Sequence, residues 1–311
     1  MYAEIIRPVD QWITPYKRWF FIPDAALDYV PFAALRADSR DESPYIVMAH
    51  DIALAPAAWM LLTPRRQPGP SLAPARILLV SDPVYQLSDP RLNLQHAPDE
   101  TSIDTPSSVN DSAAVGVPTY QRIAGTARES SAIQAVFPAA AVDVLSGLEA
   151  TRERLLQLDW SQYRYIHIAS HGYLDARMPQ LSALILSAYD QRGERIEEAL
   201  RTADLSALTL RADVAVFSGC DTALGKEVLN EGMVGIAYAT LARGAQAVVS
   251  SLWQVTDEMG ADLMTELYRH LVRDSLSPVT ALSAAMRSVL NRNASADPAL
   301  WAAFQVSVVT M

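Results

Sequence analysis

The sequence is almost without cysteine, since Cys220 is the only one among 311 residues. A single thiol cannot close an internal disulfide, and it cannot supply the several thiolates of a cysteine-based zinc site. This usage is typical of a reducing compartment, in which a reactive thiol persists. We therefore expect a cytoplasmic protein without a structural disulfide.

Long basic runs and long apolar runs are also missing from the sequence. The net charge is −10 and no stretch is rich in Lys and Arg, which disfavours binding to nucleic acids or anionic membranes. Glu4, Pro8 and Asp10 interrupt the N-terminal stretch, so it does not resemble a secretory signal. No apolar run reaches the roughly 18 residues of a membrane helix. Repeats of solenoid period are absent as well.

The sequence does contain short apolar runs that alternate with helical patterns from residue 76 onward. Half of all residues are hydrophobic, which is enough for a sizeable core. The runs predict strands at 76–81, 142–145, 165–170, 214–218, 247–252 and 301–309. Helices are predicted at 126–137, before Pro138, at 151–158, 203–208 and 233–243, and after Thr256 and Ser277. Residues 184–188 and 195–196 flank a predicted hairpin turn at 190–193.

Several details support these helices. Thr126 and Glu129 have the spacing of a capping box, Gly244 suits the position after a helix, and Ser277 precedes a proline in the order preferred at a helix start. Thr256 is the predicted N-cap of a helix whose first turn contains Asp257 and a second carboxylate.

The N-terminal part is less regular. Strands are predicted at 18–22 and 45–49 from their composition, with a short helix at 29–35 between them. Residues 65–74 form a cluster of helix and strand breakers, and 95–118 form a polar surface insertion. We divide the chain into an N-terminal subdomain at 1–120 and a main domain at 121–311.

The alternation predicts an α/β sandwich with a mostly parallel central sheet. The carboxyl ends of parallel strands lie along one edge of such a sheet. Two strands end there in chemically useful residues: IHIASHG ends beside His171, and VAVFSGCDTALG contains Cys220. We therefore expect these two side chains to meet.

Together they would form a Cys/His catalytic dyad. An imidazole lowers the pKa of a nearby thiol or takes its proton, which creates the thiolate nucleophile. The backbone N–H groups of Gly172 and Cys220 could then stabilise an oxyanion. The plainer alternative is that Cys220 is a buried small apolar residue, and that His167 is a core histidine satisfied by hydrogen bonds. A metal site at His167 and His171 is disfavoured, because residues i and i+4 of a strand lie about 13 Å apart.

These motifs resemble the signature of the CHAT domains, caspase-like cysteine peptidases of the clan that also contains caspases, separases and gingipains. Similar segments run in order through about residues 19–310: FFIPDAALDYVPFAAL, IAGTARES, GMVGIAYATLARGAQAVVSSLWQVTDE and DPALWAAFQV. The 49-residue separation of His171 and Cys220 is close to the caspase spacing of about 50. One departure is Gly219, where the family usually has alanine.

The resemblance implies a caspase-like three-layer α/β/α sandwich, with a smaller N-terminal subdomain that has a pseudo-peptidase counterpart in separases. It implies His171 as the base and Cys220 as the nucleophile, with Gly172 and Cys220 forming the oxyanion hole. No cofactor is required. A third orienting residue is not needed in this clan, and the sequence offers no obvious Asn or Asp for one.

Substrate and partner are also implied by the resemblance. The substrate is a protein or peptide, cut after a basic residue as in separases, with Trp253 as a pocket wall and Asp257 as its acidic floor. Asp221 and Asp175 are weaker candidates, and Asp257 could equally be a solvated first-turn residue. Relatives are commonly switched on by a TPR or other sensor module. The alternative function is a catalytically silent protein-interaction module in a signalling or defence complex.

Overall fold

The computed structural model describes residues 1–37, 43–62, 75–92, 120–173, 178, 181–218, 231–253 and 255–309. Its strands are β1 (Arg18–Phe21), β2 (Asp51–Leu54), β3 (Ile77–Ser81), β4 (Val142–Ser146), β5 (Tyr165–Ala169), β6 (His171–Tyr173), β7 (Ala183–Ile185), β8 (Ala199–Arg201), β9 (Val214–Ser218), β10 (Ala247–Ser251) and β11 (Phe304–Val308).

The α-helices are α1 (Tyr2–Ile5), α2 (Asp10–Ile13), α3 (Ala58–Leu62), α4 (Gly125–Gln134), α5 (Arg152–Gln157), α6 (Thr202–Ala207), α7 (Glu231–Ala242), α8 (Asp257–Val272), α9 (Pro278–Arg292) and α10 (Pro298–Trp301). Short 3-10 turns lie between them, including η4 (Ile46–Met48).

Within the described residues, the central sheet has eight strands in the order β1-β2-β11-β10-β9-β5-β3-β4. The strands from β4 to β10 in this order are parallel to one another. β11 is antiparallel to β10, and β1 and β2 run in the same direction as β11. A second, three-stranded sheet, β6-β7-β8, is antiparallel. The central sheet is therefore mostly parallel, as the alternation of runs predicts.

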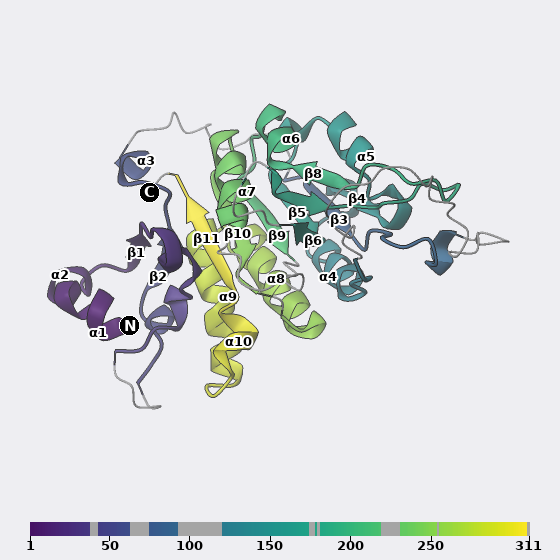
Figure 1. The fold of residues 1–311 in the computed structure, drawn as a ribbon. Coiled ribbons are helices and arrows are strands. Elements are labelled where there is room, and N and C mark those ends of the chain that lie inside the picture. Colours follow the sequence, from purple (N-terminus) through teal and green to yellow (C-terminus); the bar gives the residue numbers. More distant parts are fainter. Residues whose placement is uncertain are drawn as a thin grey trace, which may run out of the picture.

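Helices cover both faces of this sheet (Figure 1). β3, β5, β9 and β10 are buried along their whole length, which explains their continuous apolar runs. Alternate residues point to opposite faces: Ile77 and Leu79 belong to a core cluster with residues of α4, α8 and α9, whereas Leu78 and Val80 belong to one with residues of α5, α6 and α7. The architecture is a three-layer α/β/α sandwich.

Most elements predicted from residue 76 onward are confirmed within one to four residues at each end. Ser277 caps α9 as predicted, because its Oγ accepts a hydrogen bond from the Thr280 N–H. Gly244 follows α7 with φ +120°. Thr256 is the N-cap residue of α8, but its side chain makes no capping hydrogen bond. The predicted hairpin exists as the antiparallel pair β7 and β8. β7 ends three residues before the predicted end at 188, and β8 begins four residues after the predicted start at 195.

Two strand predictions need correction. Residues 45–49 contain the 3-10 turn η4, and the strand of this region is β2, which begins at Asp51. The composition of 45–49 reflects burial, since Tyr45 packs edge-on against Trp301. The predicted closing strand at 301–309 begins only at Phe304, because Trp301 ends helix α10.

Strands from both sides of residue 120 share the central sheet. β1 and β2 extend it beyond β11, and β3 lies between β4 and β5. The N-terminal strands also share a core with α8 and α9. The division at residue 120 stays a prediction, and the polar insertion at 95–118 lies outside the described residues.

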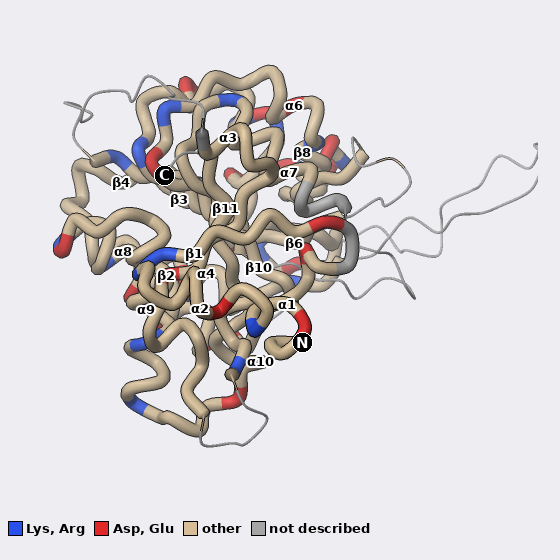
Figure 2. Tube along the Cα trace, turned by 90° about the vertical axis from the view of Figure 1, so that its left-hand side faces the viewer, with Lys and Arg blue, Asp and Glu red and all other residues tan. Residues whose placement is uncertain are grey.

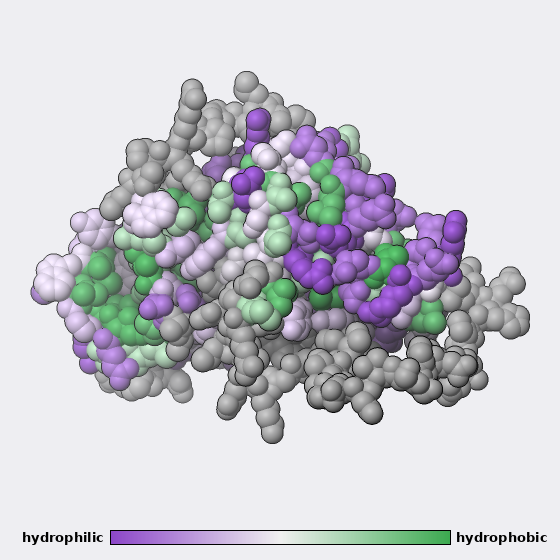
Figure 3. Space-filling view, turned by 45° about the horizontal axis from the view of Figure 1, so that its top comes forward, coloured by the Kyte–Doolittle hydropathy of each residue, from purple (hydrophilic) through white to green (hydrophobic). Residues whose placement is uncertain are grey.

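The surface differs between the two ends of the sheet. On the face in Figure 3, apolar surface gathers at the end formed by the N-terminal elements, while the opposite end is mainly hydrophilic. Trp12 and Tyr16 are exposed large hydrophobic residues of the N-terminal part. Acidic and basic residues are interspersed along the trace in Figure 2. None of the helices in the described parts of the chain has the length and apolar character needed to span a bilayer.

Candidate active site

The site lies where β5 and β9 end side by side. The two strands are paired in parallel, with Ala169 beside Ser218, and the Ser170 N–H donates a hydrogen bond to the Ser218 carbonyl (3.1 Å). The predicted adjacency of the two strand ends is therefore present. His171 lies two positions beyond Ala169, and Cys220 two positions beyond Ser218.

Part of the predicted site lies outside the described residues. This holds for Cys220 and Asp221, for Gly219 before them, and for Asp175. Gly172 is described: it lies in β6 opposite Leu184 of β7. The pairing of Cys220 with His171 and the oxyanion hole thus stay predictions. In the described part of the chain, no three or more His, Cys, Asp and Glu side chains are grouped to hold a metal ion.

His171 is buried, with 2% of its surface exposed, and its ring has a defined partner. The Nε2 atom lies 2.6 Å from the backbone carbonyl oxygen of Gln121. A carbonyl can only accept a hydrogen bond, so Nε2 carries the proton. In the neutral ring Nδ1 is then the basic nitrogen. This arrangement leaves Nδ1 as the ring nitrogen that can accept a proton.

Two tyrosines fix the position of the same histidine. The rings of Tyr85 and Tyr120 lie 4.9 Å and 5.1 Å from the His171 ring, between centroids. The Tyr85 hydroxyl accepts a hydrogen bond from the His171 N–H (3.3 Å) and donates one to the Ile185 carbonyl (3.4 Å). Burial raises the pKa of Tyr85 well above its usual range, so the phenol stays neutral and keeps its proton for Ile185.

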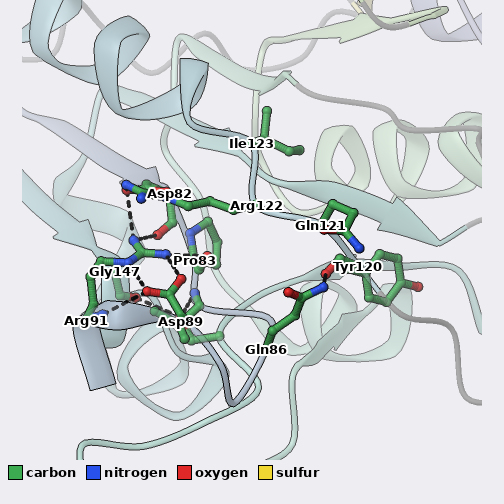
Figure 4. Close-up of polar contacts among 12 residues, drawn as sticks. Asp82, Pro83, Gln86, Asp89, Arg91, Tyr120, Gln121, Arg122, Ile123 and Gly147 are labelled. Atoms are coloured by element: carbon green, nitrogen blue, oxygen red, sulfur yellow. Dashed lines mark hydrogen bonds and ion pairs between the residues drawn. The ribbon is translucent and has the colours of Figure 1, made fainter. Parts of the chain in front are cut away.

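The sequence did not indicate Gln121 as the partner that orients the His171 ring. The residue types considered for this role were Asn and Asp, whereas the acceptor is a backbone carbonyl, which every residue has. No residue-type signal could have identified it. Figure 4 shows Gln121 between Tyr120 and Arg122.

A second buried network lies beneath the strand ends. The His167 Nε2 atom is 3.1 Å from Glu129 Oε1, and both side chains are almost fully buried. The other carboxyl oxygen of Glu129 accepts a hydrogen bond from the Ser218 hydroxyl (3.2 Å). His167 Nδ1 is 3.3 Å from the hydroxyl of Tyr268, whose pKa is raised well above the usual value by burial and by Glu129. His167 is thus a core histidine with polar partners, as the plainer interpretation holds.

The capping box predicted for Glu129 is wrong. α4 begins at Gly125, and its N-cap residue makes no side-chain capping bond. Thr126 instead accepts a hydrogen bond from the Asp82 N–H and donates one to a backbone carbonyl. Glu129 lies on the buried face of α4 with Ile133, four positions later. That helical spacing is also the pattern of a carboxyl group on the inward face of a helix, although Glu129 was predicted only as part of a capping box.

A pocket opens beside the end of β9, where Ser218 is one of its lining residues. It encloses about 400 Å³ of open space, part of it continuous with solvent. Six lining residues matter for its chemistry: Glu129, Ser218, Ser251, Trp253, Thr256 and Asp257. The predicted wall, Trp253, and the predicted acid, Asp257, therefore line one pocket, with Glu129 as a second carboxyl group that the sequence did not indicate. The Trp253 indole N–H is held by the Ala299 carbonyl (2.8 Å).

Asp257 lies directly on Gly125, the first residue of α4. A Cβ atom at Gly125 would overlap the Cβ and carboxyl atoms of Asp257. The glycine therefore permits α4 to touch the start of α8. This contact holds one side of the pocket together.

We predict that Gly125→Ala destabilises the protein by about 2 kcal/mol, the middle of the range for overpacked sites. The added methyl group forces α4 away from the start of α8. Urea unfolding monitored by circular dichroism measures the change. Gly260→Ala is the matched control: it is a helical glycine of the same pocket, whose new Cβ would lie 3.3 Å from Val255 Cγ2. Equal effects of the two substitutions would contradict the prediction.

Comparison with known proteins identifies the family. The family model of the CHAT domain matches residues 1–309. The chain belongs to the CHAT domain family. This agrees with the motifs around His171 and Cys220, and it makes the chain a member of a cysteine peptidase family.

Individual relatives are more distant than the family match. Over 108 residues the chain is 33% identical to mouse (Mus musculus) Tetratricopeptide repeat protein 28. The matched segment is 35% of this chain and 4% of the mouse protein. Two solved structures are similar: the Arg-specific cysteine proteinase gingipain R, and the complex of the Porphyromonas gingivalis RgpB pro- and mature domains. Each is 10% identical to this chain, with a TM-score of 0.41. The matched regions cover 75% of this chain, 46% of the first structure's chain and 47% of the second's. The chain spans less than half the length of these proteins.

Proposed function

We propose that this CHAT domain is a cysteine endopeptidase in which His171 and Cys220 form the catalytic dyad. The observation that carries the proposal is the geometry of His171. The side chain is buried at the end of β5, next to the strand that leads to Cys220, and its Nε2 atom is held by the Gln121 carbonyl. Membership in a cysteine peptidase family supports the same chemistry.

The reaction follows from these groups. The Cys220 sulfur, as thiolate, attacks the scissile carbonyl carbon, and the Gly172 and Cys220 N–H groups stabilise the oxyanion. His171 gives its Nδ1 proton to the leaving amine, and the peptide C–N bond breaks to leave a thioester. Water then attacks the thioester, and His171 takes one of its protons as the sulfur leaves. The Nε2–H remains bonded to Gln121 throughout, which prevents the ring from turning.

The pocket beside the end of β9 supports cleavage after Arg or Lys. Two carboxyl groups line it, Glu129 in its buried part and Asp257 at its exposed side. An arginine or lysine side chain is long enough to place its charge between them while its methylene groups pack against Trp253. An acidic side chain would be repelled by the same groups.

We further propose that a protein partner controls the activity. The support is the similarity to a mouse protein that is named for its tetratricopeptide repeats, because this pairs a CHAT-like segment with a helical repeat array in one chain. A TPR or other sensor module is therefore the expected regulator. The single unpaired thiol is consistent with action in the cytoplasm.

The proposal is tested by mapping new protein N-termini in cells that contain either the wild-type chain or Cys220→Ala. We expect a set of termini that depends on Cys220 and that is preceded by Arg or Lys. The comparison gives the substrate and the cleavage preference together. If the two cell populations yield the same termini under every activating condition tried, the alternative of a silent interaction module is favoured.

A further inference from the structure

The segment that holds His171 is itself clamped by an ion pair. Arg122 follows Gln121 directly, and its guanidinium binds Asp82 in a bidentate manner: Nε donates to Oδ1 (2.8 Å) and Nη2 to Oδ2 (2.7 Å) (Figure 4). Bidentate arginine–carboxylate pairs restrict geometry more than a single contact does. The Arg122 side chain is 44% exposed and contributes little to the core, so its main structural contact is this clamp.

Asp82 is a rigid anchor for the clamp. It follows β3 directly, adopts the left-handed φ of 51°, and has a side chain that is only 7% exposed. Its N–H donates to the Thr126 hydroxyl on α4 (2.9 Å). Arg91 binds the same carboxylate (2.8 Å) and donates a hydrogen bond to the Asp82 carbonyl (2.8 Å). The central sheet and α4 therefore fix the anchor from several sides.

The Asp82–Arg122 ion pair lies next to Gln121, the residue whose carbonyl contacts His171. Gln121 and Arg122 are both exposed, so their own side chains add little apolar burial to that of the neighbouring Tyr120. On the other side of Gln121, the Gln86 amide donates to the Tyr120 carbonyl (3.2 Å). The Gln121 carbonyl thus lies between two polar attachments, and it points to His171 Nε2 at 2.6 Å.

We propose that the Asp82–Arg122 pair positions His171 for catalysis through the Gln121 carbonyl. The inference rests on the proposed dyad function of His171. When the clamp is lost, the carbonyl moves and the Nε2 proton loses its acceptor. The imidazole then exchanges between tautomers and ring orientations, and Nδ1 is correctly placed for only part of the time. Arg122 is in this sense a positioning residue and not a catalytic one.

The test compares Arg122→Gln with the wild-type chain. Because Cys220 is the only cysteine, iodoacetamide alkylation of the whole protein reports on this thiol alone. We expect the second-order rate at neutral pH to fall about 100-fold, the scale of a misplaced catalytic group. The midpoint of the pH profile should move toward the free-thiol value of about 8.5. Arg122→Lys keeps the charge but loses the bidentate fork, and should lie between the two.

The matched control is Arg152→Gln. Arg152 forms an equivalent bidentate pair with Asp204 (3.0 and 2.6 Å), between α5 and α6 in the other helical layer. Its loss should lower stability to a similar extent and leave the pH profile unchanged. ¹⁵N NMR of the His171 ring gives a second readout: at a pH at which the ring is neutral, the wild type should show the Nε2–H tautomer and Arg122→Gln a mixture.

The outcomes separate the two proposals. If wild-type Cys220 reacts like a free thiol and His171→Ala changes nothing, the proposed dyad fails. If His171→Ala abolishes the fast reaction while Arg122→Gln keeps the wild-type rate and tautomer, only the clamp proposal is overturned. Should Arg122→Gln not fold, Arg122→Lys carries the same comparison, and a wild-type rate and tautomer in that variant overturn the clamp.

Discussion

Replacing His171 by alanine is expected to lower kcat/KM for peptide cleavage by about 1,000-fold or more, within the range for loss of a catalytic acid or base. The reason is that, in the proposed mechanism, His171 both generates the thiolate and protonates the leaving amine. Alkylation of Cys220 at neutral pH should slow in parallel, because the thiol returns to the reactivity of free cysteine. The rates are measured with an arginine-containing peptide and with iodoacetamide, respectively.

His270→Ala is the control for this experiment. His270 lies on α8 and pairs with Asp274 (2.7 Å), away from the strand ends. Its replacement removes an imidazole without touching the site, so both rates should stay within about twofold of the wild-type rates. Equal behaviour of the two histidine variants would contradict the dyad and would favour a protein-interaction role for this CHAT domain.

Replacing Asp257 by asparagine is expected to reduce kcat/KM for substrates with Arg or Lys before the cut by about 100-fold. This corresponds to about 3 kcal/mol, within the range for removing one partner of a charge pair that the bound substrate shields from solvent. Substrates with an uncharged residue at that position should change much less. Asp257 is exposed, and its loss is not expected to unfold the protein. Profiling of a peptide library measures the preference directly.

Glu258→Gln provides a matched control for Asp257. Both carboxylates lie in the first turn of α8 and both are exposed, so both substitutions weaken the same interaction with the helix dipole. Only Asp257 lines the pocket. A library preference for acidic residues in the wild type would overturn the assignment of the pocket. An unchanged preference in Asp257→Asn would show that Asp257 is a solvated first-turn residue.

The contrast between Glu129 and Asp257 shows what local sequence can indicate about the pocket. Asp257 could be proposed because it belongs to a recognisable motif after β10. Glu129 fits two interpretations, a cap for its own helix or a carboxyl group on the buried helix face, and only the packing of α4 on β5 and β9 selects the second. His167 and Ser218, its partners, come from two different strands.

The sequence by itself determined the alternation of strands and helices and the two strand ends with His171 and Cys220. It could do so because continuous apolar runs mark strands buried on both faces, and parallel strands bring their carboxyl ends to one edge. Only the tertiary structure decided that the Gln121 carbonyl holds His171 and that Asp82 and Arg122 clamp that segment. Those contacts join residues up to 50 positions apart through backbone atoms and long side chains, for which no local pattern exists.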